Sequence, residues 1–279
     1  MIGQANLQSR IEQLINNNTF PRFSIFVGPR GSGKKTFAPY IAGYMLAGWV
    51  HAFDVKIDTI REIIQQSYKV VDNTVYFIPD ADNMSNAAKN ALLKVTEEPP
   101  NNAYFIMTLE DENNTLETIR SRGTVFHMDR YTPDEIGSYF YDRYHANHGK
   151  DDETIVKELC ETPGDVDTLV KMGIKEFYDY VQLVVDNIAD VSLANAFKIP
   201  SKVALKDDVE GYDLRLFWKA FMKVCLEKAS GKGLTPEQIL DYGEAVMATD
   251  KYLQKLRVKG INRQMLIDCW LMEIRELWN

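Results

Sequence analysis

The chain has 279 residues, of which 45% are hydrophobic and 26% charged, a composition typical of a globular protein with two or three domains. No apolar stretch approaches the ~20 residues of a membrane helix, and the first residues do not resemble a signal peptide, so a cytoplasmic protein is expected. The net charge of −8 argues against a chain that wraps nucleic acid by its own electrostatics.

The cysteines and histidines do not form a metal-binding pattern. Cys160, Cys225 and Cys269 are far apart in the sequence, which indicates neither a disulfide framework nor a zinc site. We expect each to be a small buried apolar residue. The four histidines have no recognisable ligand spacing, so no metal site is predicted.

The first half of the chain alternates short apolar runs with helical patterns. We predict strands over 23–27, 53–57, 75–78 and 104–108, with helices over 37–46, 59–68 and 85–97. The segment Asn83-Met84-Ser85 supplies a candidate N-cap for the last of these helices. Such a βαβα order is typical of an α/β domain with a parallel sheet, and ligands bind such sheets at the carboxyl ends of the strands.

The strand signals fade after residue 131. We predict two or three short helices up to about residue 172, and long amphipathic helices from 174 to 279 with breaks near 198–213 and 230–235. A stripe of Leu271, Ile274, Leu277 and Trp278 near the end could pack either within a helical bundle or on a neighbouring chain.

Residues 28–36, with the sequence GPRGSGKKT, nearly match the phosphate-binding P-loop pattern. Gly28, Gly31 and Gly33 allow a tight path that points N–H groups inward, and Lys34 would reach the outer phosphates. Lys35, however, stands where the pattern requires a hydroxyl that binds magnesium, and an ammonium repels the metal. Thr36 is turned by about 100° around the helix and is a poor substitute. The loop could hydrolyse a nucleotide, hold one, or keep only the shape.

Several further motifs follow in a fixed order. In chain order with the P-loop, the set is Ile2–Gln4, the P-loop, residues 55–63, residues 75–84, residues 91–94 with 97–99, and residues 119–122. Together they resemble bacterial clamp-loader subunits of the AAA+ class, most closely the delta-prime type of the DNA polymerase III clamp loader. The resemblance covers residues 1–170 by motif and the remainder only by architecture.

This resemblance implies three domains and several partners. We expect an AAA+ P-loop α/β domain over 1–131, a small helical lid over 132–173 and an all-α collar, for oligomerisation, over 174–279. The family implies a hetero-pentameric ring of clamp-loader subunits that opens a sliding clamp and places it on primer-template DNA. No membrane partner is expected.

The resemblance also implies the roles of individual residues. Ser121 and Arg122 match a Ser-Arg-Cys motif whose arginine acts in trans on ATP bound by the neighbouring subunit, with Gly123 in place of the cysteine. A planar guanidinium stabilises charge that develops on a transferring phosphoryl group. Thr108 matches a polar phosphate sensor. The candidate nucleotide-binding residues are Gly28, Gly31, Ser32, Gly33, Lys34, Lys35, Thr36 and Thr108, and the candidate nucleotide is ATP or ADP.

Three positions depart from an active ATPase of this family. Lys35 is the first departure. The second is at the end of the strand over 75–78, where Pro79-Asp80 stands in place of two acidic residues. Asp80 is therefore only a weak candidate for a catalytic carboxylate, and a turn that caps the next helix also explains Asp80 and Asp82. At the third, Asp165 replaces a lid arginine, and a carboxylate facing phosphates would be repulsive. The cysteine-rich zinc module of many relatives has no counterpart in residues 47–74, so zinc is not expected.

These departures favour a non-hydrolysing stator that donates Arg122 to a partner's ATP site. One alternative is a catalytically active clamp-loader ATPase, the motor of the ring, that uses Lys34 and Asp80 with a distorted metal site. Another is a different P-loop enzyme such as a nucleotide kinase, in which the last 100 residues would form a substrate lid.

Overall fold

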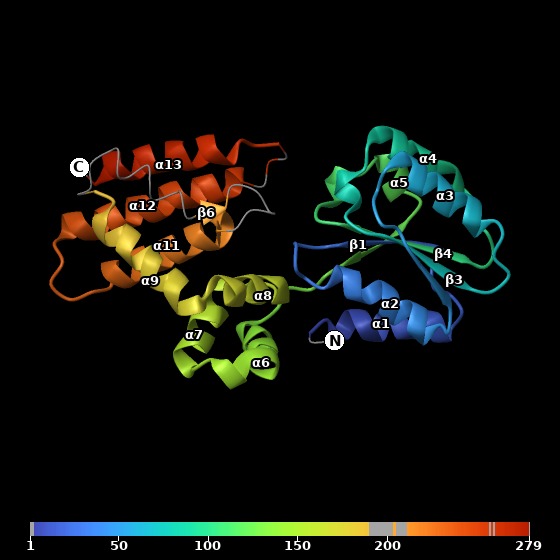
Figure 1. Ribbon diagram of the computed structural model, residues 1–279, viewed down its shortest axis with the longest axis horizontal. Helices are drawn as coiled ribbons and strands as arrows, with labels where there is room; N and C mark the ends of the chain where they lie inside the picture. Colours follow the sequence, from blue (N-terminus) through green and yellow to red (C-terminus); the bar gives the residue numbers. More distant parts are fainter. Residues whose placement is uncertain (1–2, 190–202, 205–210, 257, 259, 279) are drawn as a thin grey trace. The chain divides into compact units, whose positions relative to one another are not determined.

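The computed structural model describes residues 3–189, 203–204, 211–256, 258 and 260–278 (Figure 1). These residues form two compact units. The first comprises Met1–Tyr139 with Glu161–Gly164, and the second comprises Phe140–Cys160 with Asp165–Asn279. The division into domains 1–131, 132–173 and 174–279 stays a prediction. Ile2 and most of the predicted break over 198–213 lie outside the described residues.

The first unit is built on a five-stranded parallel sheet with strand order β2-β3-β4-β1-β5. Its strands are β1 (Phe23–Val27), β2 (Gly48–His51), β3 (Thr74–Ile78), β4 (Ala103–Leu109) and β5 (Thr124–His127). Its helices are α1 (Ala5–Asn16), α2 (Lys34–Tyr44), α3 (Ile57–Ser67), α4 (Asn86–Glu97) and α5 (Glu117–Arg120), and α6 (Pro133–Tyr144) follows them. Because all strands run the same way, the loops that follow β1, β3 and β4 meet at one edge of the sheet.

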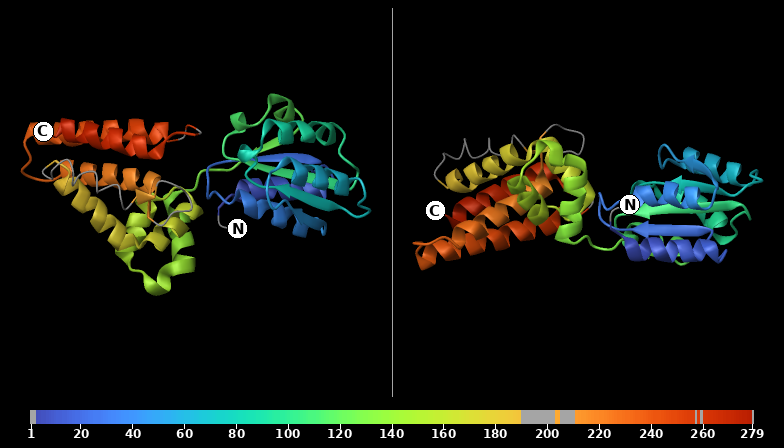
Figure 2. Two further views of the ribbon diagram at one scale, coloured as in Figure 1. Left: turned by 45° about the horizontal axis from the view of Figure 1, so that its top comes forward. Right: turned by 90° about the horizontal axis from the view of Figure 1, so that it is seen from below.

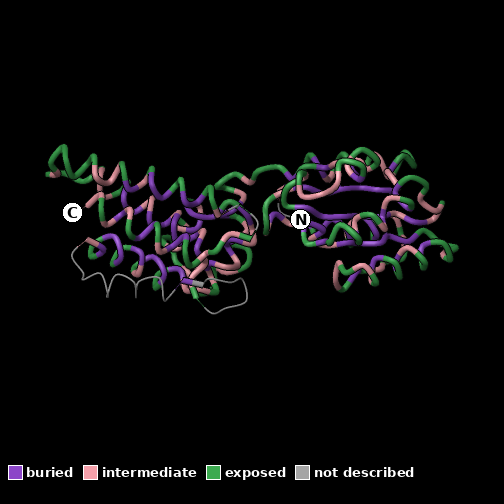
Figure 3. Tube along the Cα trace, turned by 90° about the horizontal axis from the view of Figure 1, so that it is seen from above, coloured by how far each residue is buried: buried purple, intermediate pink, exposed green. Residues whose placement is uncertain are grey.

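Helices cover both faces of this sheet, as Figures 1 and 2 show. Side chains alternate along each strand. Ile25 and Tyr76 pack in the cluster with α3 and α4, whereas Phe26 and Phe77 pack in the cluster with α1 and α2. The strands β1 and β3 are buried along their whole length. This burial on two faces explains why the two strands are apolar at every position except Ser24 and Thr74. Figure 3 shows buried stretches of chain between exposed helix surfaces in this unit.

The second strand lies earlier in the chain than the sequence pattern predicts. The predicted strand over 53–57 is wrong, since β2 occupies Gly48–His51 and pairs with β3. The carboxylate of Asp54 accepts hydrogen bonds from the Lys56 N–H at 3.1 Å and the Thr59 hydroxyl at 2.5 Å, which organises the turn into α3. β2 is an edge strand and is largely exposed, so it lacks the apolar pattern of a buried strand. The sequence reading also missed α1 and β5.

The remaining described helices lie largely or wholly in the second unit. They are α7 (Lys150–Leu159), α8 (Pro163–Met172), α9 (Ile174–Asn187), α11 (Leu214–Ala229), α12 (Pro236–Lys255) and α13 (Arg263–Leu277), with two short paired strands β6 (Val203–Ala204) and β7 (Tyr212–Asp213). Helix α11 packs against α9 and α12, and α13 packs against α12. Among the described helices, none is both long and apolar enough to cross a membrane.

The stripe at the end of the chain packs within this bundle. Leu271 and Ile274 are fully buried, and the Trp278 indole stacks on Phe221 and donates to the Asp241 carbonyl at 3.1 Å. Thr235 lies at the end of the predicted break near 230–235 and is the N-cap of α12. The C-terminal helices therefore form a core of their own.

The three cysteines differ in accessibility. Cys160 and Cys225 are buried as predicted, but the prediction is wrong for Cys269, which is exposed on α13. Burial raises the pKa of the Cys225 thiol to about 12, so its reactive thiolate form is suppressed. We expect an aromatic disulfide reagent to modify only Cys269 rapidly in the native protein, and all three thiols after denaturation. Loss of the rapid phase in Cys269→Ser would confirm the assignment, and its persistence would contradict it.

Candidate functional site

The P-loop follows β1 and leads directly into α2, the strand-to-helix context that phosphate-binding loops require. Gly31 and Gly33 have φ values of +79° and +86°, which L side chains rarely adopt. Gly28 has no such φ, but a Cβ there would lie 2.7 Å from the side chain of Met128. All three glycines of the P-loop are therefore needed. Gly31 and Gly33 are needed for their backbone conformation, and Gly28 is needed for close packing.

The Lys34 side chain turns back onto its own loop. Its ammonium donates to the carbonyl oxygens of Gly28 at 2.6 Å and Pro29 at 2.8 Å, and the residue is 6% exposed. Burial lowers the pKa of Lys34, and the carboxylates of Glu110 and Asp82 oppose that shift. Lys34 thus stabilises the loop while it places a positive charge in the phosphate-binding position.

Lys35 pairs with the weak catalytic candidate. Its Nζ lies 2.5 Å from Oδ2 of Asp80, the residue that follows β3 by two positions. Asp80 has a left-handed backbone conformation with φ +48°. One predicted departure from an active ATPase, Lys35, therefore pairs with the one carboxylate that was a candidate for catalysis, Asp80.

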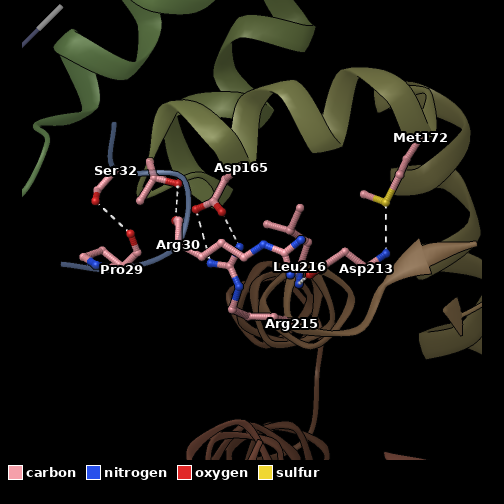
Figure 4. Close-up of polar contacts among 9 residues, drawn as sticks. Pro29, Arg30, Ser32, Asp165, Met172, Asp213, Arg215 and Leu216 are labelled. Carbon is pink, nitrogen blue, oxygen red and sulfur yellow. Dashed lines mark hydrogen bonds and ion pairs between the residues drawn. The ribbon is translucent and has the colours of Figure 1, made fainter. Parts of the chain in front are cut away.

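The two hydroxyl groups of the loop bond within the loop. The Ser32 hydroxyl donates to the Pro29 carbonyl at 2.7 Å, as Figure 4 shows, and the Thr36 hydroxyl donates to the Gly33 carbonyl at 2.6 Å. The backbone carbonyl of Ser32 accepts a hydrogen bond from the Tyr131 hydroxyl at 2.9 Å. These contacts hold the loop in shape.

Thr108 and Asp82 support the neighbouring strand ends. The buried hydroxyl of Thr108 accepts a hydrogen bond from the Asp80 N–H at 3.0 Å, which links β4 to the end of β3. Asp82 accepts from the Glu110 N–H at 2.8 Å and the Asn114 side chain at 2.9 Å. The predicted turn at Asp80 and Asp82 is present, since the Asn83 N–H donates to the Asp80 carbonyl at 3.0 Å. The prediction that these residues cap the next helix is wrong, because Ser85 caps α4 and Asp82 holds the loop after β4.

A distant segment, residues 161–164, contacts the P-loop. The Gly164 N–H donates to the Gly31 carbonyl at 3.1 Å, and the Thr162 hydroxyl donates to the Arg30 carbonyl at 3.2 Å. A Cβ on Gly164 would lie 2.5 Å from the Cα of Gly31, so both positions require glycine. The sequence reading linked this segment to the lid of relatives but missed the contact.

Asp165 is paired, contrary to the expectation that its charge would face phosphates. Its carboxylate accepts two hydrogen bonds from the Arg215 guanidinium on α11, one of them at 3.2 Å (Figure 4). The Asp165 side chain is 3% exposed. The sequence could not reveal this pair because its members are 50 positions apart, and the structural reason for Asp165 is attachment of α8 to α11.

The candidate trans arginine, Arg122, lies just beyond the end of α5. Its Nη1 donates to the Thr118 carbonyl at 2.6 Å, and its Nη2 lies 2.5 Å from the Glu97 carboxylate at the end of α4. The Arg122 side chain keeps a 33% exposed fraction. Glu97 belongs to the motif over 97–99, and the structure shows that it is the partner of Arg122.

The motif at the start of the chain also has a structural role. The Gln4 side chain is buried, donates to the Asp129 carbonyl and accepts from the Asp129 N–H, both at 2.8 Å. This two-way contact ties the first residues to the segment after β5.

The fold is that of AAA+ P-loop proteins, as predicted. A solved structure of a DNA polymerase III gamma subunit-related protein from Thermotoga maritima matches with a TM-score of 0.53 and 15% identity, and the match covers 96% of this chain and 99% of that one. At this identity, the likeness concerns the fold alone.

Sequence comparisons point to clamp loaders within this class. Residues 49–132 match the family model described as DNA polymerase III, delta subunit. A delta-prime subunit of DNA polymerase III from Haemophilus influenzae is 33% identical over 82 residues, which cover 28% of this chain and 25% of that protein. A replication factor C small subunit from Natronomonas pharaonis is 28% identical over 145 residues, covering 48% and 43%. The predicted resemblance to AAA+ clamp-loader proteins is confirmed, although the chain spans less than half the length of these relatives.

Proposed function

We propose that this chain is a delta-prime-like subunit of a DNA polymerase clamp loader that does not hydrolyse ATP itself. The observation that carries the proposal is the ion pair between Lys35 and Asp80, at 2.5 Å. It occupies the positions where an active member of this class would supply a magnesium-binding hydroxyl and a catalytic carboxylate. The P-loop would then hold ATP or ADP, or serve as a scaffold, without turnover.

In this proposal the chain is a stator within a ring. Its partners are the other clamp-loader subunits of a hetero-pentamer, the sliding clamp, and primer-template DNA bound through the assembled complex. The AAA+ domain over 1–131 and the lid over 132–173 carry the P-loop and its neighbours, and the helices over 174–279 form the collar. Arg122 is the residue donated to a neighbour's ATP, because its guanidinium is partly exposed and held by Glu97 and Thr118. The comparisons with clamp-loader proteins support this assignment.

The purified chain should release no phosphate from ATP above background, with or without DNA. The physical reason is that position 35 carries an ammonium in place of the magnesium-binding hydroxyl and so repels the metal ion, and that Asp80, the weak catalytic candidate, lies against this ammonium. A radiolabelled phosphate-release assay measures this directly, with a motor-type clamp-loader subunit as the positive control. Turnover on the order of 1 per second would contradict the proposal and favour the active motor.

A further inference from the structure

The pair between Lys35 and Asp80 has a second consequence, which concerns how the P-loop would hold a ligand. The two side chains are 58% and 49% exposed, and an exposed ion pair of this kind contributes little to stability because water screens it. Lys35 can therefore exchange its carboxylate partner for another anion at small cost. A phosphate group at the start of α2 would be such an anion.

The residues present do not fit the magnesium ion that P-loops ordinarily use. Mg²⁺ requires oxygen ligands in near-octahedral geometry. Lys35 places an ammonium where the pattern has the hydroxyl ligand of the metal, and this positive charge repels a cation whether or not Asp80 is paired with it. Within the part of the chain that the structure describes, no three His, Cys, Asp or Glu side chains form a group that could hold a metal ion.

The same loop does fit a phosphate chain. The N–H groups of Gly33, Lys34 and Lys35 have no acceptor among the described residues, because they lie at the start of α2. Gly33, with φ +86°, turns the backbone so that these groups can converge on an anion. Two ammonium groups on consecutive residues add positive charge at this position, where a P-loop of the usual pattern has one.

We propose that this P-loop binds the polyphosphate of a nucleoside di- or triphosphate without a divalent cation, with the Lys35 ammonium in the charge-compensating place of Mg²⁺. The inference rests on the nucleotide-holding part of the proposed function and is independent of the role proposed for Arg122. Asp80 then competes with the phosphate for Lys35. A nucleotide bound in this way would lack the metal ion that hydrolysis requires. Binding without hydrolysis agrees with the proposed role as a stator.

The test is a titration of the isolated full-length chain with a fluorescent ADP or ATP analogue, in EDTA and in excess Mg²⁺. We expect the two dissociation constants to agree within about threefold, which corresponds to less than 1 kcal/mol. Lys35→Thr should weaken binding in EDTA by about 10-fold or more, since a charge-assisted hydrogen bond is lost. Asp80→Asn should tighten binding in EDTA, because it frees Lys35.

A matched control and clear contrary outcomes complete the experiment. Lys56 is an exposed lysine that pairs with Asp54 at 3.3 Å in the same unit, and Lys56→Thr should leave both dissociation constants unchanged. Three outcomes would overturn the inference. The wild-type chain could bind nucleotide at least 10-fold more tightly in Mg²⁺ than in EDTA, or it could bind in neither buffer. Asp80→Asn could weaken a binding that depends on Mg²⁺, which would show that Asp80 serves a metal ion. None of these results would bear on the Arg122 experiment, so a failure here is distinguishable from failure of the stator role.

Discussion

Replacement of Arg122 by alanine should slow ATP hydrolysis at the neighbouring subunit's site by about 10³-fold, the lower end of what a trans arginine contributes to phosphoryl transfer. The guanidinium is already positioned by Thr118 and Glu97. An exposed ion pair such as the one with Glu97 contributes about 0–1 kcal/mol, so transfer of Arg122 to a phosphate costs little. The measurement is single-turnover hydrolysis of ATP bound to a motor-type subunit, reconstituted with this chain and its clamp.

Two variants control this experiment. Arg120 lies two residues earlier, pairs loosely with Glu112 at 3.8 Å and stands outside the Ser-Arg motif, so Arg120→Ala should leave hydrolysis unchanged. Arg122→Lys keeps the charge but loses the planar fork of donors and should recover little activity. If Arg122→Ala leaves the partner's hydrolysis rate unchanged while the complex still assembles, the trans role of Arg122 is wrong.

Replacement of Trp270 by alanine should lower the free energy of unfolding by about 3–5 kcal/mol, because it removes one of the two fully buried tryptophan side chains of the C-terminal bundle. Trp270 is fully buried and meets the rings of Phe217 and Phe221 edge-on, with centroids 5.7 and 5.0 Å away. Its indole N–H donates to the Thr249 hydroxyl at 3.0 Å, so the substitution also removes a buried hydrogen bond. Urea unfolding followed by far-UV circular dichroism measures the loss.

The same helix provides the control for this substitution. Met265 lies on α13 and is 57% exposed, so Met265→Ala should change the stability by no more than about 0.5 kcal/mol. A loss of less than about 1 kcal/mol in Trp270→Ala would show that the bundle is not stabilised around this side chain. Equal losses in the two variants would show that α13 as a whole responds to any substitution.

Much of the sheet and the loop could be predicted because their signals are local. The fully buried strands β1 and β3 are apolar apart from Ser24 and Thr74, and the P-loop is a continuous motif between a strand and a helix. The edge strand β2 was not predicted because it is largely exposed and therefore lacks the apolar pattern of a buried strand. Residues 53–57 have such a pattern but do not form a strand. Cys269 was misjudged for a related reason, since composition says nothing of which face of a helix a residue occupies.

By itself the sequence determined the class of fold, the place of the phosphate-binding loop and the identity of the departures at Lys35, Pro79 and Asp165. Only the tertiary structure decided what those residues contact. Lys35 meets Asp80 across 45 positions and Asp165 meets Arg215 across 50. Local propensity and spacing are set by neighbours along the chain, whereas a charge finds its partner through the packing of distant elements, which no single-sequence pattern encodes. That packing turns two apparent losses of catalytic machinery into ion pairs, and it holds Arg122 beside Glu97 at the surface.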